Sequence, residues 1–97
     1  MELRFADKDL ERLYTDPQFT AKLSQGIVKA FRRLVQYIAQ AVDERDFYAM
    51  KSLHYEKIER DDRLHSMRFN YQFRLILQIV DQKPGKVVVI QKVEDYH

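Results

Sequence analysis

The stretch LHSMRFNYQFRLILQIV, residues 64–80, decides the fold of this chain. Large apolar side chains recur at odd positions in both halves of the stretch, which is the period of β-strands that bury one face. The short polar segment NYQ, residues 70–72, separates the two halves and is typical of a turn. The stretch therefore predicts two neighbouring antiparallel strands joined by a short loop.

The same parity predicts the register of this hairpin. Residues that face each other across an antiparallel pair lie on one face of the sheet, so Met67 is expected opposite Leu75, both toward the core. Arg68 then lies directly across from Arg74 on the other face. Two adjacent arginines repel, and an anion between them would relieve the repulsion. Two solvated arginines relieved by nearby carboxylates would produce the same pattern.

The flanking segments extend this sheet. DQKPGK, residues 81–86, is a strong turn signal, and the following run VVVIQKV, residues 87–93, opens with four β-branched residues. A strand in which apolar and polar residues do not alternate is usually covered on both faces. Such a strand is expected inside the sheet and not at its edge. HYEKIE, residues 54–59, predicts a shorter strand, with a turn at Asp61 and Asp62 before the hairpin.

The first half of the chain is predicted to be helical. ELRF, residues 2–5, alternates and could form a short edge strand, and Asp7 is a suitable N-cap for a brief helix after it. Asp16 and Pro17 carry the cap and first-position signals of a long helix. Asp43 is expected to cap a third, shorter helix. The apolar stripe of the long helix comprises Leu23, Ile27, Phe31, Leu34, Ile38 and Val42.

Composition sets the limits on function. Ninety-seven residues, 45% of them hydrophobic, suit one folded domain over residues 1–97. The prediction is an α+β domain whose N-terminal helices pack on a C-terminal antiparallel sheet. The absence of cysteine excludes disulfides and thiolate sites, and three scattered histidines indicate no metal site. No apolar run suits a membrane span or leader, so a cytoplasmic protein without membrane contact is expected.

The sequence DYH at the end of the chain suggests chemistry. If the last strand continues, Asp95 and His97 lie on one face and Tyr96 on the other. A strand inside the sheet would bring them beside Arg68 and Arg74. Plainer roles fit the same residues: a salt-bridge partner, a packed aromatic and a frayed end.

Three segments together resemble a known family. VEDYH (93–97), SMRFNYQFRLIL (66–77) and HYEK (54–57) are similar to the HigB branch of the RelE/ParE superfamily of bacterial toxins. The resemblance implies a RelE-like, microbial-ribonuclease-like fold and a metal-independent endoribonuclease without cofactor, which cleaves messenger RNA on the ribosome. The partners it implies are a helix-turn-helix antitoxin of the HigA type, the ribosome and messenger RNA.

The resemblance also implies roles for individual residues. The phosphate-binding pair would be Arg68 and Arg74. The catalytic set would be His54, Lys57, Asp95, Tyr96 and His97. His65 matches no family role and shares a face with Met67, so a partly buried structural histidine is expected there.

Two other classes of protein remain open at this point. A ParE-like protein of the same fold would inhibit DNA gyrase without catalysis, and the terminal triplet and His54 count against it, because a gyrase inhibitor needs no acid–base groups. A non-catalytic RNA-binding domain is the second alternative. Its binding would fall steeply with salt and would survive the loss of His97.

Overall fold

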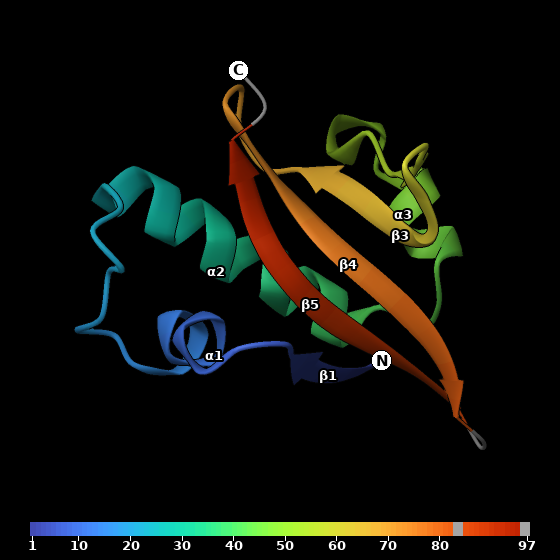
Figure 1. Cartoon of the computed structure of the whole chain (residues 1–97), viewed down its shortest axis with the longest axis horizontal. Helices are drawn as coiled ribbons and strands as arrows, with labels where there is room; N and C mark the ends of the chain where they lie inside the picture. The colour runs from blue at the N-terminus through green and yellow to red at the C-terminus, as the bar shows by residue number, and fades with distance from the viewer. Residues whose placement is uncertain (83–84, 96–97) are drawn as a thin grey trace.

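The computed structural model describes residues 1–82 and 85–95 of the chain, in which one sheet carries helices α1 and α2 on one side (Figure 1). In chain order the elements are β1 (Glu2–Phe5), α1 (Lys8–Thr15), α2 (Gln25–Gln40), α3 (Arg45–Ala49), the 3-10 helix η1 (Lys51–Leu53), β2 (Glu56–Ile58), β3 (Asp61–Arg68), β4 (Phe73–Gln82) and β5 (Gly85–Asp95).

The strands lie in the order β1-β5-β4-β3-β2. The pairs from β5 to β2 are antiparallel, whereas β1 pairs with β5 in parallel. The predicted α+β fold is confirmed, and β5 lies inside the sheet as expected. The sheet is mixed rather than wholly antiparallel, because the chain between β1 and β5 crosses over and returns in the same direction, as parallel pairs require.

The predicted start of the long helix is wrong. Asp16 does not begin α2 but forms the C-cap of α1, and its carboxylate accepts a hydrogen bond from the N–H of Gln18 (2.9 Å). Pro17 therefore lies in a loop. Further along this loop Ala21 and Lys22 adopt positive φ angles of 52° and 63°, which a right-handed helix does not permit. Helix α2 can start only beyond them.

Helix α2 supplies the helical side of the core. The hydroxyl of Ser24 accepts a hydrogen bond from the N–H of Ile27 (3.4 Å) and caps its first turn. Val42, predicted to belong to the apolar stripe, lies beyond the last helical residue and is 80% exposed. The buried face of the helix comprises Val28, Phe31, Leu34, Val35 and Ile38.

The two shorter helices begin near the predicted caps. At α1, the carboxylate of Asp7 accepts a hydrogen bond from the N–H of Leu10 (2.9 Å). Before α3, the carboxylate of Asp43 accepts one from the N–H of Arg45 (2.9 Å). Helix α3 buries Phe47 completely, so this short element belongs to the core.

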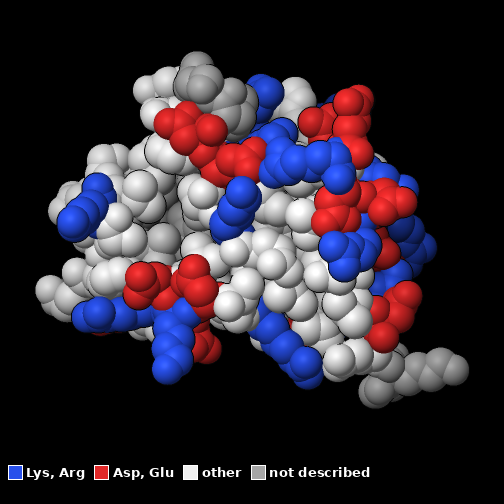
Figure 2. All heavy atoms as spheres, viewed as in Figure 1, with Lys and Arg blue, Asp and Glu red and all other residues white. Residues whose placement is uncertain are grey.

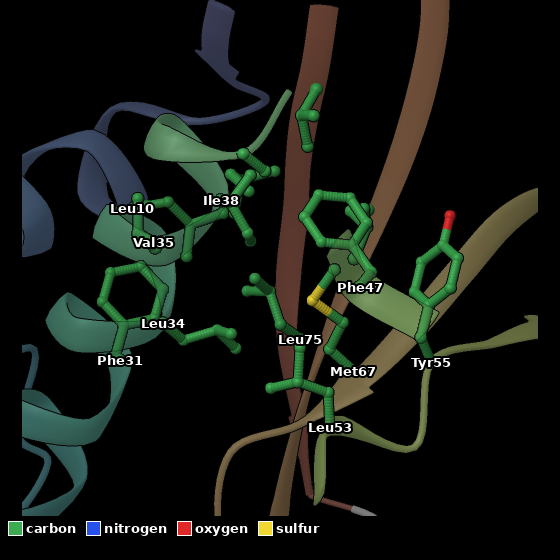
Figure 3. Packing of buried hydrophobic residues seen from close by; sticks show 14 of the residues in the cluster. Leu10, Phe31, Leu34, Val35, Ile38, Phe47, Leu53, Tyr55, Met67 and Leu75 are labelled. Carbon is green, nitrogen blue, oxygen red and sulfur yellow. The ribbon is translucent and has the colours of Figure 1, made fainter. Parts of the chain in front are cut away.

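The core lies between α2 and the helix-facing side of the sheet. Figure 3 shows Phe31 and Leu34 entering it from α2, and Met67 and Leu75 from the strands. The fully buried set includes Phe31, Phe47, Met67, Leu75, Leu77 and Ile90. The opposite face of the sheet carries Ser66, Arg68 and Arg74 beside the fully buried Ile76.

The turn between β2 and β3 lies earlier than predicted. Ile58 pairs with Asp61, so the two-residue turn is Glu59 and Arg60 rather than Asp61 and Asp62. The carboxylate of Asp61 instead binds the guanidinium of Arg63 (3.0 Å) inside β3. The earlier turn matters for the site, because it delivers Arg60 to the polar face of the sheet.

Candidate active site

Two arginines lie side by side on the face of the sheet away from the helices. Arg68 of β3 pairs with Arg74 of β4, as the parity of the sequence predicts. The N–H of Phe69 donates to the carbonyl of Phe73 (3.3 Å), so the ladder reaches the predicted three-residue loop. The rings of these two phenylalanines stack with centroids 6.3 Å apart. The register of the hairpin is therefore confirmed.

Glu94 of β5 forms ion pairs with three cationic side chains on this face of the sheet. Its Oε1 accepts hydrogen bonds from Nη2 and Nε of Arg74 (2.6 and 3.1 Å). Its Oε2 lies 2.7 Å from Nη2 of Arg60 and 3.2 Å from Nζ of Lys92. Hydrogen bonds from Arg74, Lys92 and Arg60 lower the pKa of Glu94 to about 2. These interactions stabilise the fold above about pH 4.5, and that contribution is lost as the pH falls toward 2.

A β-bulge explains why the sequence analysis missed Glu94. The pairing of β4 with β5 shifts between Ile76 and Leu77, so that Gln91 is the extra residue on β5. Without this bulge Val93 would lie opposite Arg74, and Glu94 would point to the other face. The available signal was the three-residue step from Ile90 to Val93, both of which pack on the core side.

A polar pocket of about 410 Å³ opens beside Arg74. The viewed face of the molecule shows Lys and Arg interspersed with Asp and Glu rather than one continuous basic patch (Figure 2). A phosphate in the pocket would be held by individual guanidinium groups rather than by a broad positive field. The lining consists of Glu56, Lys57, Ile58, Glu59, Arg60, Ser66 and Arg74.

His54 and Lys57 occupy different positions relative to this pocket. His54 follows η1 in the left-handed conformation (φ 48°, ψ 49°), and its N–H donates to the carbonyl of Lys51 (3.1 Å). Its side chain is exposed and does not line the pocket. Lys57 is also exposed, pairs with His65 across β2 and β3, and does line the pocket. Lys57 and Arg74 thus line the same pocket, whereas His54 does not line it.

Asp95 lies at the same end of the sheet as the arginines. It pairs with Phe73, which places it on the helix-facing side of the sheet and not on the face of Arg68 and Arg74, and one of its carboxylate oxygens accepts a hydrogen bond from Nε2 of Gln72 (2.9 Å). This bond ties the end of β5 to the loop between β3 and β4. Tyr96 and His97 lie outside the described residues, so their catalytic role stays a prediction.

Comparison with known protein families identifies the family of this chain. A family model described as the RelE-like toxin of type II toxin-antitoxin system HigB matches residues 3–97. The chain belongs to this family. Membership implies an antitoxin as partner of the HigB-like toxin. Among curated proteins, no match to the chain was found.

Solved structures show the same fold. The HigB-like toxin is similar to the YoeB/ParE toxin from Agrobacterium tumefaciens, with a TM-score of 0.62 and 11% sequence identity. The similarity covers 100% of both chains. The architecture is therefore that of a RelE/YoeB-like toxin, while the low identity carries nothing about individual side chains.

Two other features concern the described part of the HigB-like toxin. Within residues 1–82 and 85–95, no helix is long and apolar enough to cross a bilayer. Over the same residues, no group of three or more His, Asp or Glu side chains is placed to hold a metal ion.

His65 lies on the helix-facing side of the toxin's sheet, away from the arginine pair. Its ring stacks on that of Tyr55, with centroids 5.0 Å apart and planes 9° apart. Its Nδ1 is buried and has no hydrogen-bond partner among the described residues. Burial and the nearby charge of Lys57 lower the pKa of His65, and Glu44 opposes them weakly. The position agrees with the expected partly buried, structural histidine.

His65→Phe is expected to make the toxin less sensitive to acid. Because the folded state lowers the pKa of His65 below 6.5, the unfolded state takes up the proton more readily. This contribution to stability is complete above pH 6.5 and is lost as the pH falls below it. Phenylalanine keeps the ring against Tyr55 and does not titrate. Urea unfolding of both proteins at pH 7 and 5 measures the effect, and an equal loss in both would contradict it.

Proposed function

We propose that this HigB-like toxin is an endoribonuclease that cleaves messenger RNA on the translating ribosome. The observation that supports it most is the pairing of Arg68 with Arg74 at the end of the sheet where Asp95 lies. Guanidinium groups suit phosphate oxygens, which two rigid forks can hold from two sides. An arginine pair of this kind suits the binding of a phosphodiester and the stabilisation of the charge that grows on it during cleavage.

The proposed chemistry needs groups of three kinds. A base takes the proton of the 2′-hydroxyl, which attacks the phosphorus, and an acid protonates the 5′-oxygen that leaves. Cations stabilise the negative charge that grows on the phosphate oxygens. Histidine, with an ordinary pKa of about 6.5, can serve as acid or base at neutral pH.

Roles for the catalytic candidates follow from these requirements. His54 and His97 are the proposed proton-transfer groups, and Lys57 adds positive charge at the rim of the polar pocket. Asp95 is a carboxylate that can favour the charged form of an imidazole near it. Tyr96 can stack on an unpaired base, which is a common way of holding single-stranded RNA.

Expression without an antitoxin is expected to stop bacterial growth and to cut messages that are being translated. Primer extension on a defined message, with and without inhibition of translation, detects the cuts and their dependence on the ribosome. Full-length messages and normal growth at confirmed expression would contradict the proposal. Arrest with intact messages and inhibited DNA supercoiling would instead indicate a gyrase inhibitor.

A further inference from the structure

A second, largely apolar pocket lies on the other side of the β3 end. Its volume is about 330 Å³, and it lies between α2 and η1. Leu34 from α2 and Leu53 from η1 point toward each other in Figure 3, and both are buried. Phe69, the residue after β3, completes the apolar lining. Apolar walls with a few polar groups at this volume are typical of sites for small molecules.

The charged side chains that line this pocket are both positive. Arg33 of α2 and Arg68 of β3 both line it, and the described residues of the lining include no carboxylate. The polar pocket around Arg74 differs, because Glu56 and Glu59 contribute to it. The occupant of the apolar pocket should therefore combine an apolar or aromatic surface, on which a guanidinium can stack, with an anionic group.

Arg68 connects this pocket to the proposed phosphate site. It lines the pocket and also stands opposite Arg74 in the ladder, where neighbouring side chains begin about 5 Å apart. A ligand whose phosphate lies at the arginine pair can thus place an attached group in the pocket. In single-stranded RNA that attached group is a nucleobase, which proteins hold by stacking and by contacts to its polar edge.

We propose that the pocket between α2 and η1 binds the base of the nucleotide that carries the phosphate held by Arg68 and Arg74. This inference rests on the proposed function and adds a base-binding subsite to it. The apolar walls of Leu34 and Leu53 cover the base, and Arg33 faces its polar edge. A protein helix fits less well, because a pocket of about 330 Å³ has room for a small group and not for several helical turns.

The test fills the pocket and measures nucleotide binding. Ala30, which lines the pocket from α2, becomes tryptophan in Ala30→Trp, and Ser52→Trp fills it from η1 should the first variant fold poorly. Gln36→Trp, on the exposed side of the same helix, is the matched control. The probes are the four nucleoside 3′-monophosphates and inorganic phosphate, followed through the NMR methyl signals of Leu34 and Leu53.

Nucleotides are expected to shift both methyl signals in the wild type and in Gln36→Trp, whereas inorganic phosphate does not. In Ala30→Trp, nucleotide affinity should fall at least tenfold, while phosphate affinity, followed through the Nε–H signals of Arg68 and Arg74, is unchanged. Equal nucleotide affinity in the filled variants would overturn the subsite. So would a tenfold loss of antitoxin binding in them with nucleotide binding intact, which would mark a protein-docking groove. Because the titration involves no cleavage, an inactive toxin that still binds nucleotides here would refute the proposed function and not the subsite.

Discussion

Arg74→Ala is expected to slow the cleavage of ribosome-bound messenger RNA by about 10²- to 10³-fold, the usual cost of removing one group that stabilises charge in a transition state. The free energy of unfolding should fall by only about 1 kcal/mol, because the pair is partly exposed and Glu94 keeps Arg60 and Lys92 as partners. Single-turnover cleavage and urea unfolding of the same samples separate the two effects.

The control for Arg74 is another arginine of the same sheet. Arg63 binds Asp61 (3.0 Å) within β3, is largely exposed, and lines neither pocket. Arg63→Ala should leave cleavage within a few-fold of the wild type. A cleavage rate in Arg74→Ala that falls only as far as the folded fraction falls would assign that arginine a purely structural role.

His97→Gln is expected to reduce cleavage by about 10²- to 10⁴-fold, the contribution of one positioned proton-transfer group. Glutamine keeps a hydrogen-bond donor but cannot carry a proton at neutral pH. The variant should remain folded and should still bind its antitoxin and the ribosome. The pH dependence of single-turnover cleavage should lose one of its limbs, which the loss of a binding contact alone would not cause.

A second histidine variant makes this experiment decisive. His54→Gln is measured beside His97→Gln, and His65→Phe is the control, since His65 lies on the helix-facing side of the sheet. If His97→Gln cleaves at the wild-type rate, His97 is neither acid nor base. A loss in His54→Gln would then move the role to His54 and Lys57.

The hairpin could be predicted because one simple rule governs it. Side chains alternate strictly along a strand, so the odd positions of Met67 and Leu75 determine which face carries Arg68 and Arg74. No knowledge of the rest of the molecule enters that inference. For this reason the pairing of Arg68 with Arg74 in the candidate site could be predicted from the sequence.

The ion pairs of Glu94 and the start of α2 could not be predicted, because they depend on local breaks in regular structure. The extra residue Gln91 reverses the faces of everything after it on β5, Glu94 included. The loop before α2 contains positive φ angles at Ala21 and Lys22, residues that give no sign of such a conformation. Asp16 is a residue type that favours helix starts, but here it ends α1 as its C-cap.

The position of β5 has a consequence for how the toxin folds. This strand follows all the other described elements in chain order, yet it lies between β4 and β1, and its pairing of Val88 with Leu3 joins residues 85 positions apart. Such distant contacts raise the contact order and slow folding, since a long loop must close before they form. A nascent chain that lacks residues 85–95 lacks the strand that joins β1 to β4, and it also lacks Glu94. The ion pairs of Glu94 with Arg60 and Arg74 can therefore form only after β5 has been synthesised.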